Sequence, residues 1–259
     1  MALDGPPMQR DSIFRLASKA SAITAATVMT LVDDGKLELD EPVDRLLPEL
    51  ADRRVLRSMD GPVDDTVPAK RPITVEDLLS NRSGWGLILE PPGTYPIQET
   101  IADLGIVGFG PPDPLMPFDS DEWLRRLATL PLFAQPGERF LYATGTYIQG
   151  VLIERLQGKS LGEVMAERIF ERLGMKDTGF FVPPDKLDRL VTAYRPTKDG
   201  GLEVLDDPKT GGWSRPPKFE PGDSGLVRQR TTIWHSSACC LPAAHQAAGN
   251  CCRPNPSRQ

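Results

Sequence analysis

The sequence predicts an α+β fold, with one domain over residues 1–227 and a separate tail over residues 228–259. Helix-type patterns dominate the middle of the chain, strand-type patterns lie towards both ends, and no internal repeat is present. Helices and strands that are segregated along a chain in this way form layers around one core. The hydrophobic and charged fractions, 39% and 25%, are ordinary for a globular enzyme.

The first expected elements are an extended segment at residues 12–17 and the helix after it. Ser18 has the residue type of a helix N-cap, apolar side chains recur after it, and Gly35 provides a stop. A second helix is expected at residues 75–79, because Thr74 precedes it and an acidic residue follows three positions later, as in a capping box.

The middle of the chain opens with a long irregular segment. Residues 90–118 are rich in Pro and Gly, which predicts a surface excursion without regular structure. Asp119 or Ser120 then has the residue type that starts a helix, and the apolar positions after it extend to Leu127.

Two more helices and a hairpin complete the predicted domain. A helical pattern runs over residues 146–156 and stops at Gly158, and Ser160 then opens a capped helix that reaches residue 174. Residues 190–195 and 202–205 flank a turn rich in Gly and predict a β-hairpin.

Charge and hydropathy exclude several classes of partner. The net charge of −6 argues against nucleic-acid or anionic-membrane binding, which needs clustered Lys and Arg. The longest apolar runs are shorter than the roughly 18 residues of a membrane span. Residues 1–11 are polar and lack the apolar region of a signal peptide, so a cytoplasmic location is expected.

The placement of His and Cys excludes two kinds of nucleophilic site. Both His and all four Cys of the chain follow residue 230, so the predicted domain can hold neither a Ser-His-Asp triad nor a Cys nucleophile. The Cys residues form adjacent pairs, Cys239–Cys240 and Cys251–Cys252, without the spacing of a zinc site. We therefore expect no metal and no cofactor.

Several stretches, taken in order, resemble the serine β-lactamase and penicillin-binding-protein superfamily, and most closely its family VIII carboxylesterases. The matching stretches are residues 12–18, 22–29, 35–43, 72–79, 83–84, 135–142, 169–180 and 211–217. The resemblance implies a β-lactamase/transpeptidase-like fold, in which helices flank an antiparallel sheet and a helical subdomain is added. It also implies ester or amide hydrolysis through an acyl-serine intermediate, with a small-molecule substrate.

Members of this superfamily carry Ser-x-x-Lys at the start of a central helix. Residues i and i+3 share a helix face, so the Lys amine lies beside the Ser hydroxyl and acts as its base. Ser18 corresponds to the nucleophile, but Ser21 occupies the position of the Lys. Lys19 is turned roughly 100° away on the helix. The resemblance therefore implies an impaired or inactive site, because loss of a general base typically costs about 10²–10⁴ in rate.

A second catalytic position of the superfamily is matched by Tyr142. The resemblance implies that Tyr142 relays protons between the nucleophile and the leaving group; a buried structural aromatic is the alternative. Lys209-Thr210-Gly211 has the composition of a third superfamily motif, but it precedes the Gly225–Val227 stretch that this motif should follow. We interpret it as a chance turn.

The resemblance ends after Val227. Suitable codons for residues 228–240, read in a shifted frame, encode a segment close to the Thr-Ala-Asp-Asp-Tyr of relatives. We therefore expect an out-of-frame, disordered tail and a domain truncated at both ends; a genuine divergent tail is the alternative. Two functions remain open: a serine hydrolase that acts through Ser18, and a non-catalytic remnant or binding module with the same fold. The sequence does not indicate an oligomeric state.

Overall fold

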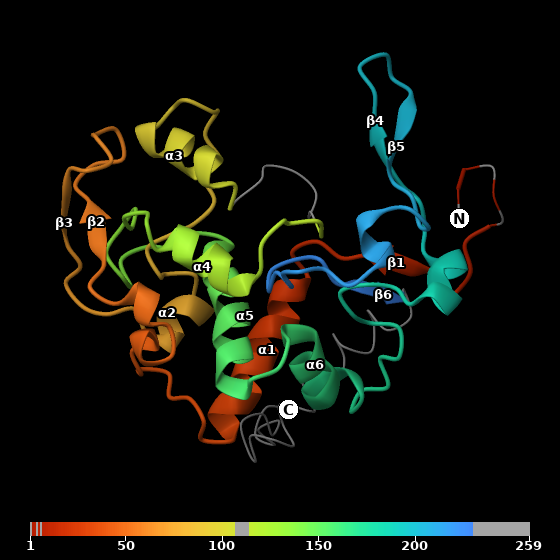
Figure 1. Ribbon diagram of the computed structural model, residues 1–259, viewed down its shortest axis with the longest axis horizontal. Helices are drawn as coiled ribbons and strands as arrows, with labels where there is room; N and C mark the ends of the chain where they lie inside the picture. Colours follow the sequence, from red (N-terminus) through yellow and green to blue (C-terminus); the bar gives the residue numbers. More distant parts are fainter. Residues whose placement is uncertain (1, 4, 6, 107–113, 230–259) are drawn as a thin grey trace, which may run out of the picture.

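Two long helices, α1 (Ala20–Asp33) and α5 (Thr144–Gln157), pack against each other at the centre of the computed structural model (Figure 1). The structure describes residues 2–3, 5, 7–106 and 114–229. The shorter helix α6 (Leu161–Met165) contacts both long helices and completes a helical layer. This layer positions the candidate site, because α1 and α5 both begin beside it.

Shorter helices and three pairs of strands surround this centre. The other helices are α2 (Val75–Leu79), α3 (Pro96–Leu104) and α4 (Ser120–Leu127). The strands pair antiparallel as β1 (Ile13–Arg15) with β6 (Val227–Gln229), β2 (Arg54–Leu56) with β3 (Thr66–Pro68), and β4 (Ala193–Pro196) with β5 (Leu202–Asp206). In Figure 1 the β4–β5 hairpin projects away from the body. The predicted α+β fold is confirmed.

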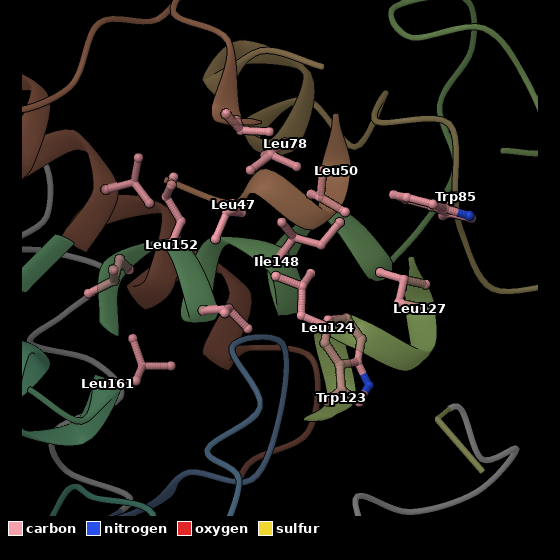
Figure 2. Packing of buried hydrophobic residues seen from close by; sticks show 14 of the residues in the cluster. Leu47, Leu50, Leu78, Trp85, Trp123, Leu124, Leu127, Ile148, Leu152 and Leu161 are labelled. Carbon is pink, nitrogen blue, oxygen red and sulfur yellow. The ribbon is translucent and has the colours of Figure 1, made fainter. Parts of the chain in front are cut away.

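The main hydrophobic core lies between α5, α4 and the segment after α1. Figure 2 shows Ile148 of α5 between Leu50 and Leu124, with Leu152 towards Leu47. All four leucines and Ile148 are at most 2% exposed. Since burial of each such side chain stabilises the fold by about 1.5–3 kcal/mol, this cluster holds α5 against its neighbours.

Local capping fixes the starts of three helices as the sequence predicts. Thr74 and Asp77 form a reciprocal capping box on α2. The Asp119 carboxylate accepts from the N–H of Glu122 at 2.9 Å at the start of α4. Ser160 caps α6 in the same reciprocal way as Thr74. These contacts satisfy N–H groups that a helix leaves without internal partners.

Three expectations differ from the structure. α1 starts at Ala20 with Lys19 as its N-cap, so Ser18 lies two residues before the helix and is not its N-cap. The predicted excursion at residues 90–118 contains helix α3, because Pro96 is well suited to the first turn. Helix α6 passes into one wide turn at Ala166–Phe170 rather than continuing to residue 174.

The predicted tail begins inside a strand. Arg228 and Gln229 belong to β6 and pair with Phe14 and Ile13 of β1. Residues 230–259, including every Cys and His, lie outside the described residues, as does the expected disorder of the tail. Among the helices that the structure describes, none combines the length and apolarity needed to cross a bilayer.

Candidate active site

Ser18 lies in the turn that links β1 to α1. The turn is held by two main-chain hydrogen bonds, from Ala20 to Ala17 at 3.1 Å and from Ser21 to Ser18 at 3.2 Å. Leu16 donates to the carbonyl of Leu226 at 2.6 Å, which anchors the turn to the loop before β6. The Ser18 side chain is exposed, so an electrophile can reach its hydroxyl. The adjacent N-terminus of α1 provides a positive potential.

Ser21 lies in the first turn of α1, half-buried. Its Oγ donates to the main-chain carbonyl of Asp223 over 3.5 Å, at the outer limit of a hydrogen bond. The Lys19 side chain is exposed. Position 21 therefore faces another segment of the protein, whereas Lys19 points to solvent.

Tyr142 lies just before α5 on a backbone of unusual geometry. Its carbonyl accepts from Leu87 at 2.9 Å and from Thr144 at 3.1 Å. The next residue, Ala143, has φ 76° and ψ −54°, a region that costs a non-glycine residue on the order of 1–3 kcal/mol. The Tyr142 side chain is 38% exposed and its ring lies 6.4 Å from that of Phe140. Strain of this kind is concentrated at functional sites.

A loop before β6, residues 221–226, is wedged between α1 and α5; we call it the Gly222 loop. The Gly222 carbonyl accepts a hydrogen bond from Thr24 of α1. A Cβ at position 222 would lie 2.3 Å from the carbonyl oxygen of Thr146 of α5, so only glycine fits. Figure 1 shows this blue segment passing the N-terminal end of α1. The loop thus joins the Ser18 turn to the first turn of α5.

The side chain of Asp223 lies inside this junction. Asp223 is 7% exposed, and its Oδ1 makes no hydrogen bond with any described residue. Burial raises the pKa of the Asp223 carboxyl, and its side-chain interactions with Ser224 and Tyr147 only partly offset this effect. An isolated buried carboxylate is costly, so this carboxyl favours uptake of a proton.

Tyr147, five residues after Tyr142, faces the same carboxyl. Its ring stacks on Trp123 at 5.4 Å and on Phe219 at 6.1 Å. Burial raises the pKa of the Tyr147 phenol well above its ordinary value, and the negative charge of Asp223 raises it further. Tyr142 adds a smaller increase to the same pKa, so the two phenols are close enough to interact. The Tyr147 phenol and the Asp223 carboxyl therefore face each other inside the junction.

A hollow of about 390 Å³ opens beside the Ser18 turn. Its walls include Ala17, Leu115 and Trp213. The Arg15 guanidinium lies 5.1 Å from the centre of the Trp213 ring and forms an ion pair with Asp206. Because most of the lining is apolar, the hollow suits an uncharged organic group.

The structure brings Ser18 and Ser21 into one turn, and it places Tyr142 just before α5, with Leu87, Thr144 and Phe140 as neighbours. Lys209-Thr210-Gly211 forms a turn in which Asp207 accepts from the main-chain N–H groups of Lys209 and Thr210, as the chance-turn interpretation predicts. Sequence reasoning missed Tyr147 and Asp223. The available signal was an acidic residue inside a Gly-Asp-Ser-Gly stretch that the resemblance covers. Within the described ranges, His, Cys, Asp and Glu form no group of three suited to a metal ion.

Comparisons with known proteins identify the family of the chain. A family model described as Beta-lactamase matches residues 2–244. Protein Rv1367c of Mycobacterium tuberculosis H37Rv is 39% identical over 224 residues, which are 86% of this chain and 52% of that protein. Esterase EstB of Burkholderia gladioli is 37% identical over 177 residues, which are 68% of this chain and 40% of that protein. The chain therefore spans about half the length of the curated relatives it matches.

Two solved structures share the fold of this chain. EstCE1, a hydrolase with promiscuous acyltransferase activity, superposes with a TM-score of 0.68 at 26% identity. The superposition covers 88% of this chain and 58% of that chain. A simvastatin synthase (LovD) from Aspergillus terreus superposes with a TM-score of 0.65 at 26% identity, over 89% of this chain and 55% of that chain.

Proposed function

Because the chain belongs to the β-lactamase family, with esterases and acyltransferases among its relatives, we propose that it transfers acyl groups from small-molecule esters or amides through Ser18. The observation that carries the proposal is the exposed Ser18 hydroxyl beside the start of α1, in a turn that the Gly222 loop ties to the first turn of α5. An exposed nucleophile, a phenol as a proton donor and an apolar hollow are parts that acyl transfer can use.

In the proposed reaction, the Ser18 Oγ attacks the carbonyl carbon of the substrate and its proton passes to solvent water, which restores the proton that Tyr142 gives to the leaving group. The main-chain N–H of Ser18, at the positive end of α1, is the candidate donor to the oxyanion. Tyr142 is the candidate acid that gives a proton to the departing alkoxide or amine. Water or an acceptor alcohol then takes the acyl group from Ser18, which corresponds to hydrolysis or transfer.

The rate should be lower than in relatives that carry Ser-x-x-Lys. Ser21 offers a hydroxyl with an ordinary pKa far above 7, so it cannot replace an amine as the direct base. A missing general base typically lowers the rate by about 10²–10⁴. We therefore propose an impaired serine hydrolase.

Ser21 also favours a second candidate function, a non-catalytic member of the fold that binds small molecules in the hollow beside Trp213. In that case Ser18 is an exposed serine that forms no acyl intermediate. Binding of an ester to this hollow without acylation of Ser18 distinguishes this candidate from the first.

The test is acylation of the full chain by a short-chain p-nitrophenyl ester and by a cephalosporin, followed by intact mass spectrometry and peptide mapping. The proposal expects one acyl group per chain, on Ser18, and loss of it in Ser18→Ala. Ser58→Ala changes a different exposed serine and should acylate like the parent. Equal acylation of the parent and of Ser18→Ala would exclude Ser18 as the nucleophile.

A further inference from the structure

We propose, building on the proposed function, that Asn81 and Gly86 are positioning residues that hold Tyr142 where it protonates the leaving group. Both belong to residues 81–87, which lie between α2 and α3 and which we call the Asn81 segment. This segment contacts the main chain of Leu141 and Tyr142 through both of its ends. The inference concerns how the proposed acid is held.

Two main-chain hydrogen bonds tie the backbone at Tyr142 to the Asn81 segment. The N–H of Leu141 donates to the Asn81 carbonyl at 2.7 Å, and the N–H of Leu87 donates to the Tyr142 carbonyl at 2.9 Å. The two bonds lie on opposite sides of the Tyr142 Cα, so they fix both its position and the direction of the chain through it. The direction in which a side chain extends depends on this backbone geometry.

Gly86 allows the Asn81 segment to lie directly against Leu141. A Cβ at position 86 would be 2.6 Å from both the carbonyl carbon and the Cβ of Leu141. Carbon atoms in contact prefer a separation of about 3.5–4.0 Å, so a larger residue at position 86 has to displace the main chain that leads into Tyr142. The close approach at Gly86 therefore determines where this main chain lies.

The Asn81 segment is itself anchored to the protein. The Trp85 ring is 1% exposed, and its Nε1 donates to the carbonyl of Pro131 at 3.0 Å. The Gly84 carbonyl accepts from the N–H of Phe133 at 2.7 Å. A segment with these contacts provides a rigid support for the residues that it touches.

Unusual backbone geometry occurs on both sides of this contact. Among the described residues, three other than glycine have a positive φ, and two of them are Asn81 at 54° and Ala143 at 76°. Asn adopts the left-handed region readily, whereas Ala does so only where the surrounding structure enforces it. The contacts of the Asn81 segment with Leu141 and Tyr142 provide that constraint on the chain just before Ala143.

The Tyr142 ring depends on these main-chain anchors because its own packing is sparse. The side chain is 38% exposed, and the ring that it faces, that of Phe140, lies 6.4 Å away. A proton donor has to lie within hydrogen-bond reach of the leaving atom, and a misplacement of about 1 Å can cost roughly 10²-fold in rate. An exposed phenol can hold such a position when the backbone beneath it is fixed.

The test compares kcat/KM for an ethyl ester and a p-nitrophenyl ester of the same acid. Ethoxide needs a proton to leave, whereas p-nitrophenolate leaves without one. Gly86→Ala and Asn81→Ala should therefore slow the ethyl ester by about 10-fold to 10²-fold and leave the p-nitrophenyl ester near the parental rate. A general structural defect would slow both esters alike. Gly61→Ala is the matched control, since its Cβ would meet nothing closer than 3.5 Å.

Two further variants test whether the effect acts through Tyr142 and through the backbone. In a Tyr142→Phe background, Gly86→Ala should cause no additional loss with the ethyl ester, because the proton donor is already absent. Asn81→Gly accepts a positive φ and keeps the carbonyl that bonds to Leu141, so it should retain the parental ratio of the two rates. The inference is wrong if Asn81→Gly is as defective as Asn81→Ala, or if Gly86→Ala slows both esters equally.

A measurement that does not need activity separates this inference from the proposed function. Fluorotyrosine placed at position 142 reports the surroundings of the ring by fluorine NMR. Its resonance should shift in Gly86→Ala and Asn81→Ala and stay in place in Gly61→Ala; an unchanged resonance in the first two overturns the inference. If Ser18 is not acylated, the proposed function fails, while this resonance still decides whether Asn81 and Gly86 hold Tyr142. Where Gly86→Ala does not fold, the comparison of Asn81→Ala with Asn81→Gly decides.

Discussion

The Ser21 hydroxyl donates to the main-chain carbonyl of Asp223 across a separation of 202 positions in the sequence. This contact joins the first turn of α1 to the Gly222 loop, and it places a hydroxyl where the superfamily uses an amine. Substitution at position 21 is therefore a direct test of the proposed proton transfer.

Ser21→Lys should increase ester hydrolysis by roughly 10²-fold or more, because it restores Ser-x-x-Lys and places an amine beside the Ser18 hydroxyl. The measurement is kcat/KM with a short-chain p-nitrophenyl ester. Ala22→Lys, one position further on an exposed face of α1, is the control and should not increase the rate. If Ser21→Lys and Ala22→Lys both hydrolyse the ester at the parental rate, Ser18 is not a nucleophile that an amine at position 21 activates.

Gly222→Ala should destabilise the protein by about 1–3 kcal/mol, the usual effect of forcing extra volume into a packed site. The new Cβ would lie 2.3 Å from the Thr146 carbonyl oxygen, which is main chain and cannot move aside cheaply. Chemical unfolding followed by circular dichroism measures the change. Gly61→Ala is the control, since its Cβ would meet nothing closer than 3.5 Å. A Gly222→Ala variant as stable as the parent would contradict the wedged position of this loop.

Glu220, next to the Gly222 loop, should make the protein less stable as the pH rises through neutrality. Burial and the neighbouring Glu154 raise its pKa to about 7, although its bond from the N–H of Gly162 acts in the opposite direction. The ordinary pKa is 4.5, so the folded state binds the proton more tightly, and this contribution is full below pH 4.5 and is lost as the pH rises through 7.

Glu220→Gln should remove that dependence, because its amide oxygen can still accept from Gly162 while no charge forms. The expected result is a variant with a higher melting temperature than the parent at pH 8 and a similar one at pH 5. Glu171→Gln, on an exposed side chain, should follow the parent at both values. If the melting temperatures of Glu220→Gln and the parent change in parallel between pH 5 and pH 8, burial does not raise the pKa of Glu220.

The features that sequence reasoning predicted are those that depend on neighbouring residues. The capping boxes of α2 and α6 need only a polar residue and an acid three positions later, so Thr74 and Ser160 identified them. The turn at Lys209 is likewise a local interaction with Asp207. Chain order alone was enough to relate Ser18 and Ser21.

The features that sequence reasoning missed depend on segments that lie far apart in the chain. The hairpin of β2 and β3 lacks a clear alternating pattern and gains its burial from contacts elsewhere, such as the hydrogen bond from Leu56 to Leu132. Tyr147 and Asp223 lie 76 positions apart, and only the packing of the Gly222 loop between α1 and α5 brings them together. The N-cap of α1 differs by one residue from the expectation, because the turn bonds at residues 17–21 hold Ser18 outside the helix.

Asp77 stabilises the start of α2 from a buried position. Burial by itself would raise the pKa of the Asp77 carboxyl, but hydrogen bonds from Arg71 and from the main chain of Thr74 outweigh it and lower the pKa below 3.8. The Arg71 Nη2 lies 2.8 Å from Oδ1, and the Thr74 N–H donates to Oδ2 at 3.0 Å.

Asp77→Asn should therefore cost about 1.5–3 kcal/mol at pH 7, the range for hydrogen bonds to a charged group, with the lower end favoured because Arg71 is partly exposed. The stabilisation by a carboxyl with a lowered pKa is present above pH 3.8 and is lost as the pH falls below it. The difference in melting temperature between the parent and Asp77→Asn should thus shrink from pH 7 to pH 3. Asp64→Asn, on an exposed side chain, should match the parent at both values. If the difference in melting temperature between the parent and Asp77→Asn stays constant with pH, the effect of Asp77 on α2 comes from side-chain packing and not from its charge.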